Sequence, residues 1–166
     1  MAEDSTEHVQ TRALEHVAGN EDRPALRYAL ETRDRPGPAY KAGVFSDDIV
    51  WIQLRGGLMV GRARVSIAWK GEYASIDEVK RRVSGWDVPS SFWDGRSKNG
   101  YAIVAELADE RWIEPYWSGP RSYGYEWIVL ENDAKRASWL DGKDPPRSGA
   151  DLPARFHAAR ATGFPR

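Results

Sequence analysis

Three groups of residues carry side chains that could recognise a nucleic acid or a nucleotide. The first is Glu31-Thr32-Arg33 with the following Lys41, the second extends from Trp93 to Lys98 and contains Arg96, and the third extends from Tyr116 to Tyr123 and contains Trp117 and Arg121. Arginine offers a planar fork of donors for a phosphate or a base edge, and aromatic rings stack on bases. Aromatic loops also simply cover hydrophobic cores, so each group alone leaves both explanations open.

Two further arginines, Arg62 and Arg64, lie in a segment that we predict to form a β-hairpin over residues 47–69. Period-two alternation places Arg62 and Arg64 on one face of the second strand, together with Leu58, Val60 and Ser66. The opposite face would carry Met59, Gly61, Ala63, Val65, Ile67 and Trp69. A glycine inside a strand indicates a bulge or a close approach by another segment or a ligand. The two arginines contact a ligand or face solvent, and the alternation alone does not distinguish these outcomes.

Several catalytic chemistries are disfavoured by what the sequence lacks. It has no phosphate-binding Walker loop, no dinucleotide fingerprint, no His-Glu-x-x-His motif and no nucleophile elbow. The absence of cysteine excludes disulfides and thiolate chemistry. We expect the three histidines, His8, His16 and His157, to lie at the periphery, and we predict no metal site and no cofactor.

Composition describes a globular chain. Its 166 residues are 41% hydrophobic and 30% charged, and the net charge is −1, so bulk charge does not indicate a nucleic-acid binder. The N-terminus lacks the features of a signal peptide, and no segment approaches the roughly 20 apolar residues that span a bilayer. A cytoplasmic protein without a membrane partner is the expectation. Eight tryptophans and seven tyrosines suggest that some rings line a surface where stacking is useful.

The pattern along the chain predicts an α+β fold. We expect an amphipathic helix over 5–18, a strand over 25–33, the hairpin, a capped helix from Ser75 to Val83, strands over 101–107, 112–115 and 125–131, and a helical turn or two over 134–140. In the strand over 25–33, Leu26, Tyr28, Leu30 and Thr32 would face inward and Arg27, Glu31 and Arg33 outward. Because these strands do not alternate regularly with helices, we predict a small curled β-barrel of about five or six mixed strands with short helices at its mouth.

The order of these features resembles the PUA-like superfamily, most nearly the ASCH domain and secondarily the EVE domain. The ASCH signature is Gly-x-Lys-x-x-Glu-x-Arg. Glu31 and Arg33 match it, whereas Leu26 stands at the glycine position and Tyr28 at the lysine position. The resemblance covers roughly residues 24–131. It divides the chain into an N-terminal helical extension (1–23), a PUA-like domain (24–140) and a Pro, Gly and Arg-rich C-terminal extension (141–166).

The resemblance implies a cleft for RNA or a modified nucleotide. Our leading hypothesis is a domain that binds RNA, single-stranded DNA or a modified nucleotide. Its arginines would be Arg33, Arg62, Arg64, Arg96 and Arg121, its stacking rings Trp93, Trp117 and Tyr123, and its acceptor for an exocyclic amine Glu31. Some proteins resembling this family are small amidohydrolases that use the motif lysine. The alternative is therefore a small hydrolase, an amidohydrolase or nuclease that acts on modified nucleosides or RNA. Its candidate catalytic residues are Lys41 as nucleophile or base activator, Glu31 as acid/base and Thr32 as an orienting hydroxyl. A third possibility is a peptide-interaction module, which predicts an exposed apolar patch without convergent arginines.

Overall fold

The computed structural model describes residues 5–12, 27–86, 88–119 and 126–144. The strands are β1 (Glu7–Arg12), β2 (Tyr28–Arg33), β3 (Ile49–Leu54), β4 (Leu58–Tyr73), β5 (Gly100–Trp117) and β6 (Trp127–Leu130). The helices are α2 (Pro38–Ala42), α3 (Ile76–Arg82), the 3-10 helix η2 (Ser90–Trp93) and α4 (Asp133–Leu140). None of the helices described is long and apolar enough to cross a membrane.

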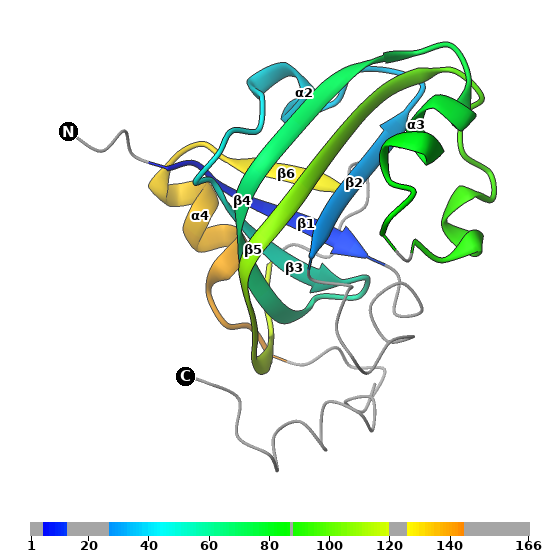
Figure 1. Ribbon diagram of the computed structural model, residues 1–166. Coiled ribbons are helices and arrows are strands. Elements are labelled where there is room, and N and C mark those ends of the chain that lie inside the picture. Colours follow the sequence, from blue (N-terminus) through cyan, green and yellow to red (C-terminus); the bar gives the residue numbers. More distant parts are fainter. Residues whose placement is uncertain (1–4, 13–26, 87, 120–125, 145–166) are drawn as a thin grey trace.

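The described strands form one curled, mixed sheet in the order β2-β5-β4-β3-β1-β6. β1 runs parallel to β3, and the other neighbouring strands pair antiparallel. The long β4 and β5 run side by side across the molecule, and the short helices flank the curl of the sheet (Figure 1). The predicted α+β class, with a curled sheet of five or six mixed strands, is confirmed. The strands expected over 101–107 and 112–115 belong to a single strand, β5.

The predicted hairpin is present as β3 and β4, but its alternation differs from the expectation. The pairing of β4 with β5 shifts register between Met59 and Gly61 and at two later points. These irregularities put Leu58 and Val60 in the same core as Ala63 and Val65, while Met59 packs in a different core. Ile67, which the alternation placed on the same face as Ala63 and Val65, is 63% exposed. Of the two alternatives that Gly61 left open, the structure shows the irregular pairing of a bulge, and it explains why strict alternation fails.

Three groups of buried side chains hold the sheet and helices together. The main core lies within the curl and draws on β2 through β6. A second core packs β2, β4 and β5 against α3 and η2, and a third packs β1, β4 and β6 against α4. α3 begins as predicted, with the Ser75 side chain accepting a hydrogen bond from the Asp77 amide. α4 begins with the equivalent contact from Lys135 N–H to the Asn132 side chain.

The segment expected as an N-terminal helix is a strand. Glu7–Arg12 forms β1, which lies between β3 and β6, while residues 13–18 of the predicted helix are outside the described residues. The helical prediction rested on Val9, Ala13, Leu14 and Val17. Pairing with two neighbouring strands satisfies the backbone of β1 along both edges, so tertiary context overrides the local pattern. His8, expected at the periphery, is fully buried because it lies on this strand.

Side chains of β1 also bridge to β2, the end strand of the sheet order. Gln10 Nε2 donates to the carbonyl oxygen of Leu30 at 2.9 Å, and Arg12 Nη2 donates to the carbonyl oxygen of Tyr28. The Arg12 guanidinium also donates through Nε to Gln10 Oε1 at 2.8 Å. Carbonyls at a strand edge attract other strands unless they are occupied. Gln10 and Arg12 therefore occupy two carbonyl oxygens of β2.

Candidate nucleic-acid interface

A hollow of about 390 Å³ opens where β2 ends. Its lining is highly polar and comes from the end of β2, the loop after η2, the β3–β4 turn and the residue before β6: Thr32, Arg33, Asp34, Arg55, Asp94, Gly95, Arg96, Ser97 and Glu126. This volume lies in the range of small-molecule and cofactor sites. We call this hollow the β2 cleft. A cavity of about 20 Å³, large enough for a water molecule, shares Arg55, Arg96 and Glu126 with the cleft and reaches Gln10 and Arg12.

One carboxylate in the β2 cleft lies between two guanidinium groups. Glu126 Oε2 accepts from Arg96 Nη1 at 2.9 Å, and Glu126 Oε1 accepts from Arg55 Nη2 at 3.2 Å. Arg96 is also held by the Phe92 carbonyl, to which its Nε donates at 2.9 Å, and its guanidinium lies 4.0 Å from the centre of the Phe92 ring. The Arg96 side chain is only 15% exposed, so its orientation is set by η2 as well as by Glu126.

Glu31 lies beside the cleft as a buried carboxyl group. It is 2% exposed, and its Oε2 has no hydrogen-bond partner among the described residues. Burial raises the pKa of Glu31 to about 7, because a charged carboxylate is poorly solvated there; Arg33 and Arg96 oppose the shift and Glu126 adds to it. All three of these charged neighbours line the β2 cleft. The prediction that Glu31 faces outward is wrong, because both faces of β2 are covered.

The end of β2 is fixed by two glycines. A Cβ at Gly37, the residue before α2, would lie 3.3 Å from Arg33 Cδ and 3.5 Å from Glu31 Oε1, so both side chains pack on the same glycine. Gly100 has φ +154°, and a Cβ there would come within 2.1 Å of the Arg33 carbonyl oxygen. Glycine at position 100 thus lets β5 approach the backbone of Arg33 closely.

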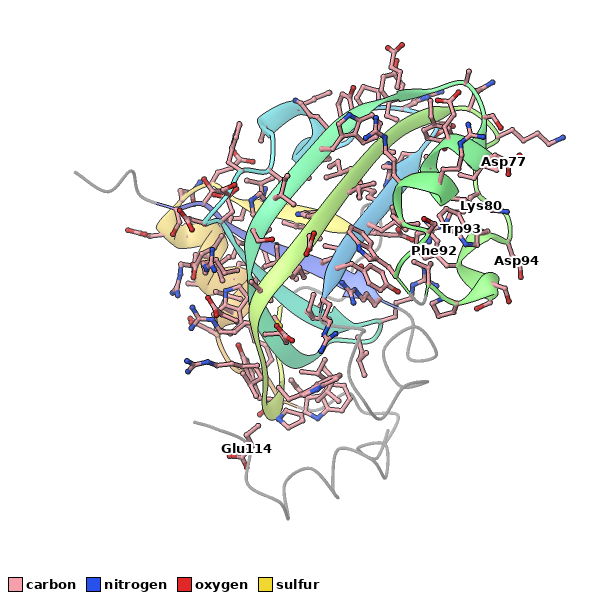
Figure 2. The ribbon with its side chains drawn as sticks, in the orientation of Figure 1. Asp77, Lys80, Phe92, Trp93, Asp94 and Glu114 are labelled. Carbon is pink, nitrogen blue, oxygen red and sulfur yellow. The ribbon has the colours of Figure 1, made fainter. Side chains whose placement is uncertain are left out.

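The structure brings together some of the predicted site residues. Glu31, Thr32, Arg33 and Arg96 come from two of the three sequence groups and meet at the β2 cleft. Asp94, next to η2, also lines the cleft; Figure 2 shows it with Phe92 and Trp93 on the same side of the molecule as Lys80 of α3. The Lys80 ammonium lies 5.6 Å from the centre of the Trp93 ring.

Other predicted residues do not line the cleft. Arg64 pairs with Asp47 at 3.1 Å and with Asp109 at 2.9 Å. Arg62 lies over the Trp51 ring, with its Cζ 5.0 Å from the ring centre. Trp117 packs partly buried against the main core. Two further candidates, Arg121 and Tyr123, lie outside the described residues.

Lys41, the candidate nucleophile of the hydrolase hypothesis, lies exposed on α2. It is not part of the cleft lining, and none of the side-chain hydrogen bonds found in the described segments joins it to Glu31. Thr32 does line the cleft, and its buried hydroxyl oxygen has no hydrogen-bond partner among the described residues. The residues that meet at the cleft are therefore suited to binding a polar ligand. They do not include Lys41, which the hydrolase hypothesis requires next to Glu31.

Sequence reasoning missed four residues at or next to the cleft: Gln10, Arg12, Arg55 and Glu126. For β1 a signal was present, because His8, Gln10 and Arg12 alternate with Val9 and Thr11 as a strand requires. Arg55 lies in the β3–β4 turn and Glu126 directly precedes β6, and neither position carries a local signal of a binding site. Within the described segments no group of three histidine, aspartate or glutamate side chains could hold a metal ion.

Comparisons with known proteins return structures but no sequence family. No protein-family model matches the chain, and no curated protein matches it. Among solved structures, ASCH from Zymomonas mobilis is 14% identical over 96% of both chains, with a TM-score of 0.47. A point variant of that protein is 13% identical, covering 98% of this chain and 99% of its own, with a TM-score of 0.48. The N-terminal domain of Staphylothermus marinus McrB is 12% identical over 95% and 94% of the two chains, with a TM-score of 0.41.

Two of these structures carry the name of the family that the sequence resembles. Since every one of these TM-scores is below 0.5, no residue role passes from these proteins to this chain. The assignment of roles at the β2 cleft depends on the chain's own residues.

Proposed function

We propose that this protein binds a single-stranded nucleic acid, RNA in the first instance, by taking one nucleotide unit into the β2 cleft. Arg33, Arg55 and Arg96 would contact phosphate, and Glu31 would hydrogen-bond a base edge. The observation that carries the proposal is the convergence of these three guanidinium groups on one hollow beside a buried carboxyl group.

The charge of the β2 cleft favours binding of one or a few nucleotides over binding of a long stretch of phosphate backbone. Three acidic residues, Asp34, Asp94 and Glu126, line the same hollow as the three arginines. Their charges balance, so the attraction to a distant phosphate chain is small and recognition depends on local guanidinium geometry. A single-stranded target suits such a site because its bases can leave the stack and enter a pocket.

A protonated Glu31 would offer a base a donor and an acceptor side by side. At a pKa of about 7 this carboxyl group is partly neutral at physiological pH. A neutral carboxyl group matches an edge that presents an acceptor next to an amine, as in cytosine and adenine, whereas a carboxylate offers acceptors only. The protonation state of Glu31 would therefore determine which base edges it can hydrogen-bond.

The peptide-binding alternative has less support. Among the residues that the structure describes, the only large hydrophobic side chains that are exposed are Phe45 and Ile67, neither of which lines the β2 cleft. The arginines converge on a polar hollow instead, which is the arrangement that the nucleic-acid hypothesis requires. The hydrolase alternative needs two further assays: recovered RNA is checked for shortening, which tests a nuclease, and acylated cytidine is incubated with the protein and analysed by chromatography, which tests an amidohydrolase.

Binding of fluorescein-labelled single-stranded RNA, followed by fluorescence anisotropy, tests the proposal. We expect Arg33→Ala to weaken binding about tenfold or more, as the loss of a charge-assisted contact would. Arg27→Ala is the matched control, because Arg27 is an exposed arginine paired with Glu110 and lies outside the cleft lining. Equal affinities for the two variants, with both proteins folded, would contradict the proposal.

A further inference from the structure

The Glu126 carboxylate occupies the position that an anionic ligand would take in the β2 cleft. Its two oxygens lie on two different guanidinium groups, those of Arg96 at 2.9 Å and Arg55 at 3.2 Å. Phosphate oxygens make the same kind of charge-assisted contact with guanidinium groups. A carboxylate and a phosphate therefore compete for these two arginines.

Contacts that do not involve Glu126 hold the Arg96 side chain and the Arg55 backbone. Arg96 is held by the Phe92 carbonyl and lies against the Phe92 ring. The backbone of Arg55 is held by its N–H, which donates to the Arg12 carbonyl oxygen at 2.9 Å. The Arg96 guanidinium would thus stay in place if the Glu126 carboxylate moved away, and the Arg55 side chain, which is 55% exposed, can turn toward a bound phosphate by rotation.

The Glu126 side chain can move without moving its backbone. The Glu126 carbonyl oxygen accepts a hydrogen bond from the Thr11 amide at 2.7 Å, which anchors the residue to the end of β1. The carboxylate is 25% exposed and can turn toward solvent by side-chain rotation. Displacement by a ligand then costs two ion pairs but no refolding of the sheet.

We infer that the space between Arg55 and Arg96 is a phosphate-binding subsite, and that Glu126 is a built-in competitor that occupies it in the free protein and sets its affinity. The inference depends on the proposed function only for the identity of the larger ligand, because the subsite itself would take inorganic phosphate. Glu126 is one of the three acids that balance the three arginines of the cleft, and it is the one whose carboxylate pairs with two of them.

The direct test compares Glu126→Gln with Glu131→Gln. Both remove one negative charge, but Glu131 pairs with Lys135 at 3.1 Å and does not line the β2 cleft. Binding of inorganic phosphate would be measured by isothermal titration calorimetry in a chloride buffer. We expect Glu126→Gln to bind phosphate about tenfold more tightly than the wild type, which is about 1.4 kcal/mol, and Glu131→Gln to change the affinity less than twofold.

Adding Arg55→Gln to Glu126→Gln should abolish the gain, because one side of the subsite is then missing. Glu126→Asp, which keeps the charge but shortens the side chain, is a second variant whose phosphate affinity should also rise. Circular dichroism of each variant establishes that it is folded. Two trinucleotides, one with a 5′-phosphate and one with a 5′-hydroxyl group, then distinguish the kinds of phosphate. If the subsite takes a terminal phosphate, Glu126→Gln gains more affinity for the 5′-phosphorylated trinucleotide. If it takes an internal phosphodiester, the variant gains equally for both.

The inference is overturned if folded Glu126→Gln binds phosphate and the trinucleotides no more tightly than Glu131→Gln. Weaker binding would also overturn it, since Glu126 would then position the arginines rather than compete for them. The proposed function fails separately. If the wild type binds no RNA while Glu126→Gln gains phosphate affinity, the subsite stands and RNA is the wrong ligand. If RNA binding depends on Arg33 and Glu126→Gln gains no phosphate affinity, the proposed function is supported and the role of Glu126 as a competitor is not.

Discussion

Gln10 Nε2 donates a 2.9 Å hydrogen bond to the carbonyl oxygen of Leu30, which joins β1 to β2 by a side chain rather than by a ladder of backbone bonds. The same amide group accepts from Arg12 Nε at 2.8 Å, and Gln10 is 3% exposed. The Gln10 side chain thus hydrogen-bonds both the Leu30 carbonyl oxygen on β2 and Arg12 Nε on β1. This contact joins the end strand β2, which carries Arg33 at its end, to β1 on the far side of the sheet order.

We expect Gln10→Ala to lower the free energy of unfolding by about 2–4 kcal/mol. The substitution leaves the Leu30 carbonyl and Arg12 Nε buried without these partners, and each such loss costs about 1–3 kcal/mol. Urea denaturation followed by tryptophan fluorescence measures the change. Thr11→Ala on the same strand is the control and should cost less than about 1 kcal/mol, because its side-chain contact with the Glu126 carbonyl is long, at 3.5 Å. Equal losses would show that Gln10 has no special role.

The buried carboxyl group of Glu31 should make stability depend on pH in an unusual direction. Its pKa in the folded protein is raised from 4.5 to about 7, so between these values the folded state holds a proton that the unfolded state has lost. Stability from this group is therefore complete below about pH 4.5, falls as pH rises toward 7, and levels off above it. The total change is on the order of 3 kcal/mol.

Glu31→Gln removes this titration and should remove the corresponding part of the pH dependence. Urea denaturation at pH 5 and pH 8 for the wild type and the variant gives the difference directly. His8, whose pKa burial lowers, contributes equally to both proteins and cancels. Glu106→Gln, on the exposed side of β5, should keep the wild-type dependence. If the wild type and Glu31→Gln lose the same stability between the two pH values, Glu31 is not a buried titrating group.

We expect Gly100→Ala to destabilise the fold by more than about 2 kcal/mol and to displace the end of β2. Its φ of +154° is strained for any side chain, and the added Cβ would clash with the Arg33 carbonyl oxygen. Gly85→Ala is the control, since nothing lies within 4 Å of its added Cβ. Thermal unfolding measures stability, and RNA affinity should fall in the Gly100 variant even where it is folded. A Gly100→Ala protein with wild-type stability and affinity would contradict the close approach of β5 to β2.

The neighbouring acids Asp47 and Asp48 should respond very differently to the same substitution. The Asp48 side chain is buried and accepts from the Thr6 amide at 3.0 Å and from the Phe45 amide at 2.9 Å, and it contacts His8 Nε2 at 2.9 Å. Asp48→Asn should therefore cost about 2 kcal/mol or more. Asp47 makes only an exposed pair with Arg64, so Asp47→Asn should leave the urea midpoint nearly unchanged. Similar midpoints for both variants would refute the assignment of Asp48 as the anchor of β1 to β3.

The sequence allowed the hairpin, the capped helix over Ile76–Arg82 and the mixed curled sheet to be predicted, because these follow from local signals: glycine turns, a serine cap and alternation. The prediction was wrong at β1, because Val9 fits the spacing of a helix while His8, Gln10 and Arg12 fit the alternation of a strand. Only the neighbouring strands decide between the two patterns.

The candidate site was predicted where its residues are local and missed where they are distant. Glu31 and Arg33 stand two positions apart, so their shared face was evident, but the burial of Glu31 depends on residues that pack over both faces of β2. Arg96 was suspected from its loop. Its partner Glu126 is 30 positions away and could be found only in the folded protein.

Nuclear magnetic resonance of ¹⁵N-labelled protein titrated with single-stranded RNA tests the central claim most directly. The account predicts that backbone amide signals of cleft residues, such as those of Arg33, Gly95 and Ser97, shift progressively with RNA, while those of α4 do not. Shifts concentrated around Arg62 and Arg64 on β4, or no shifts at all at millimolar RNA, would contradict the assignment of the β2 cleft as the nucleic-acid interface.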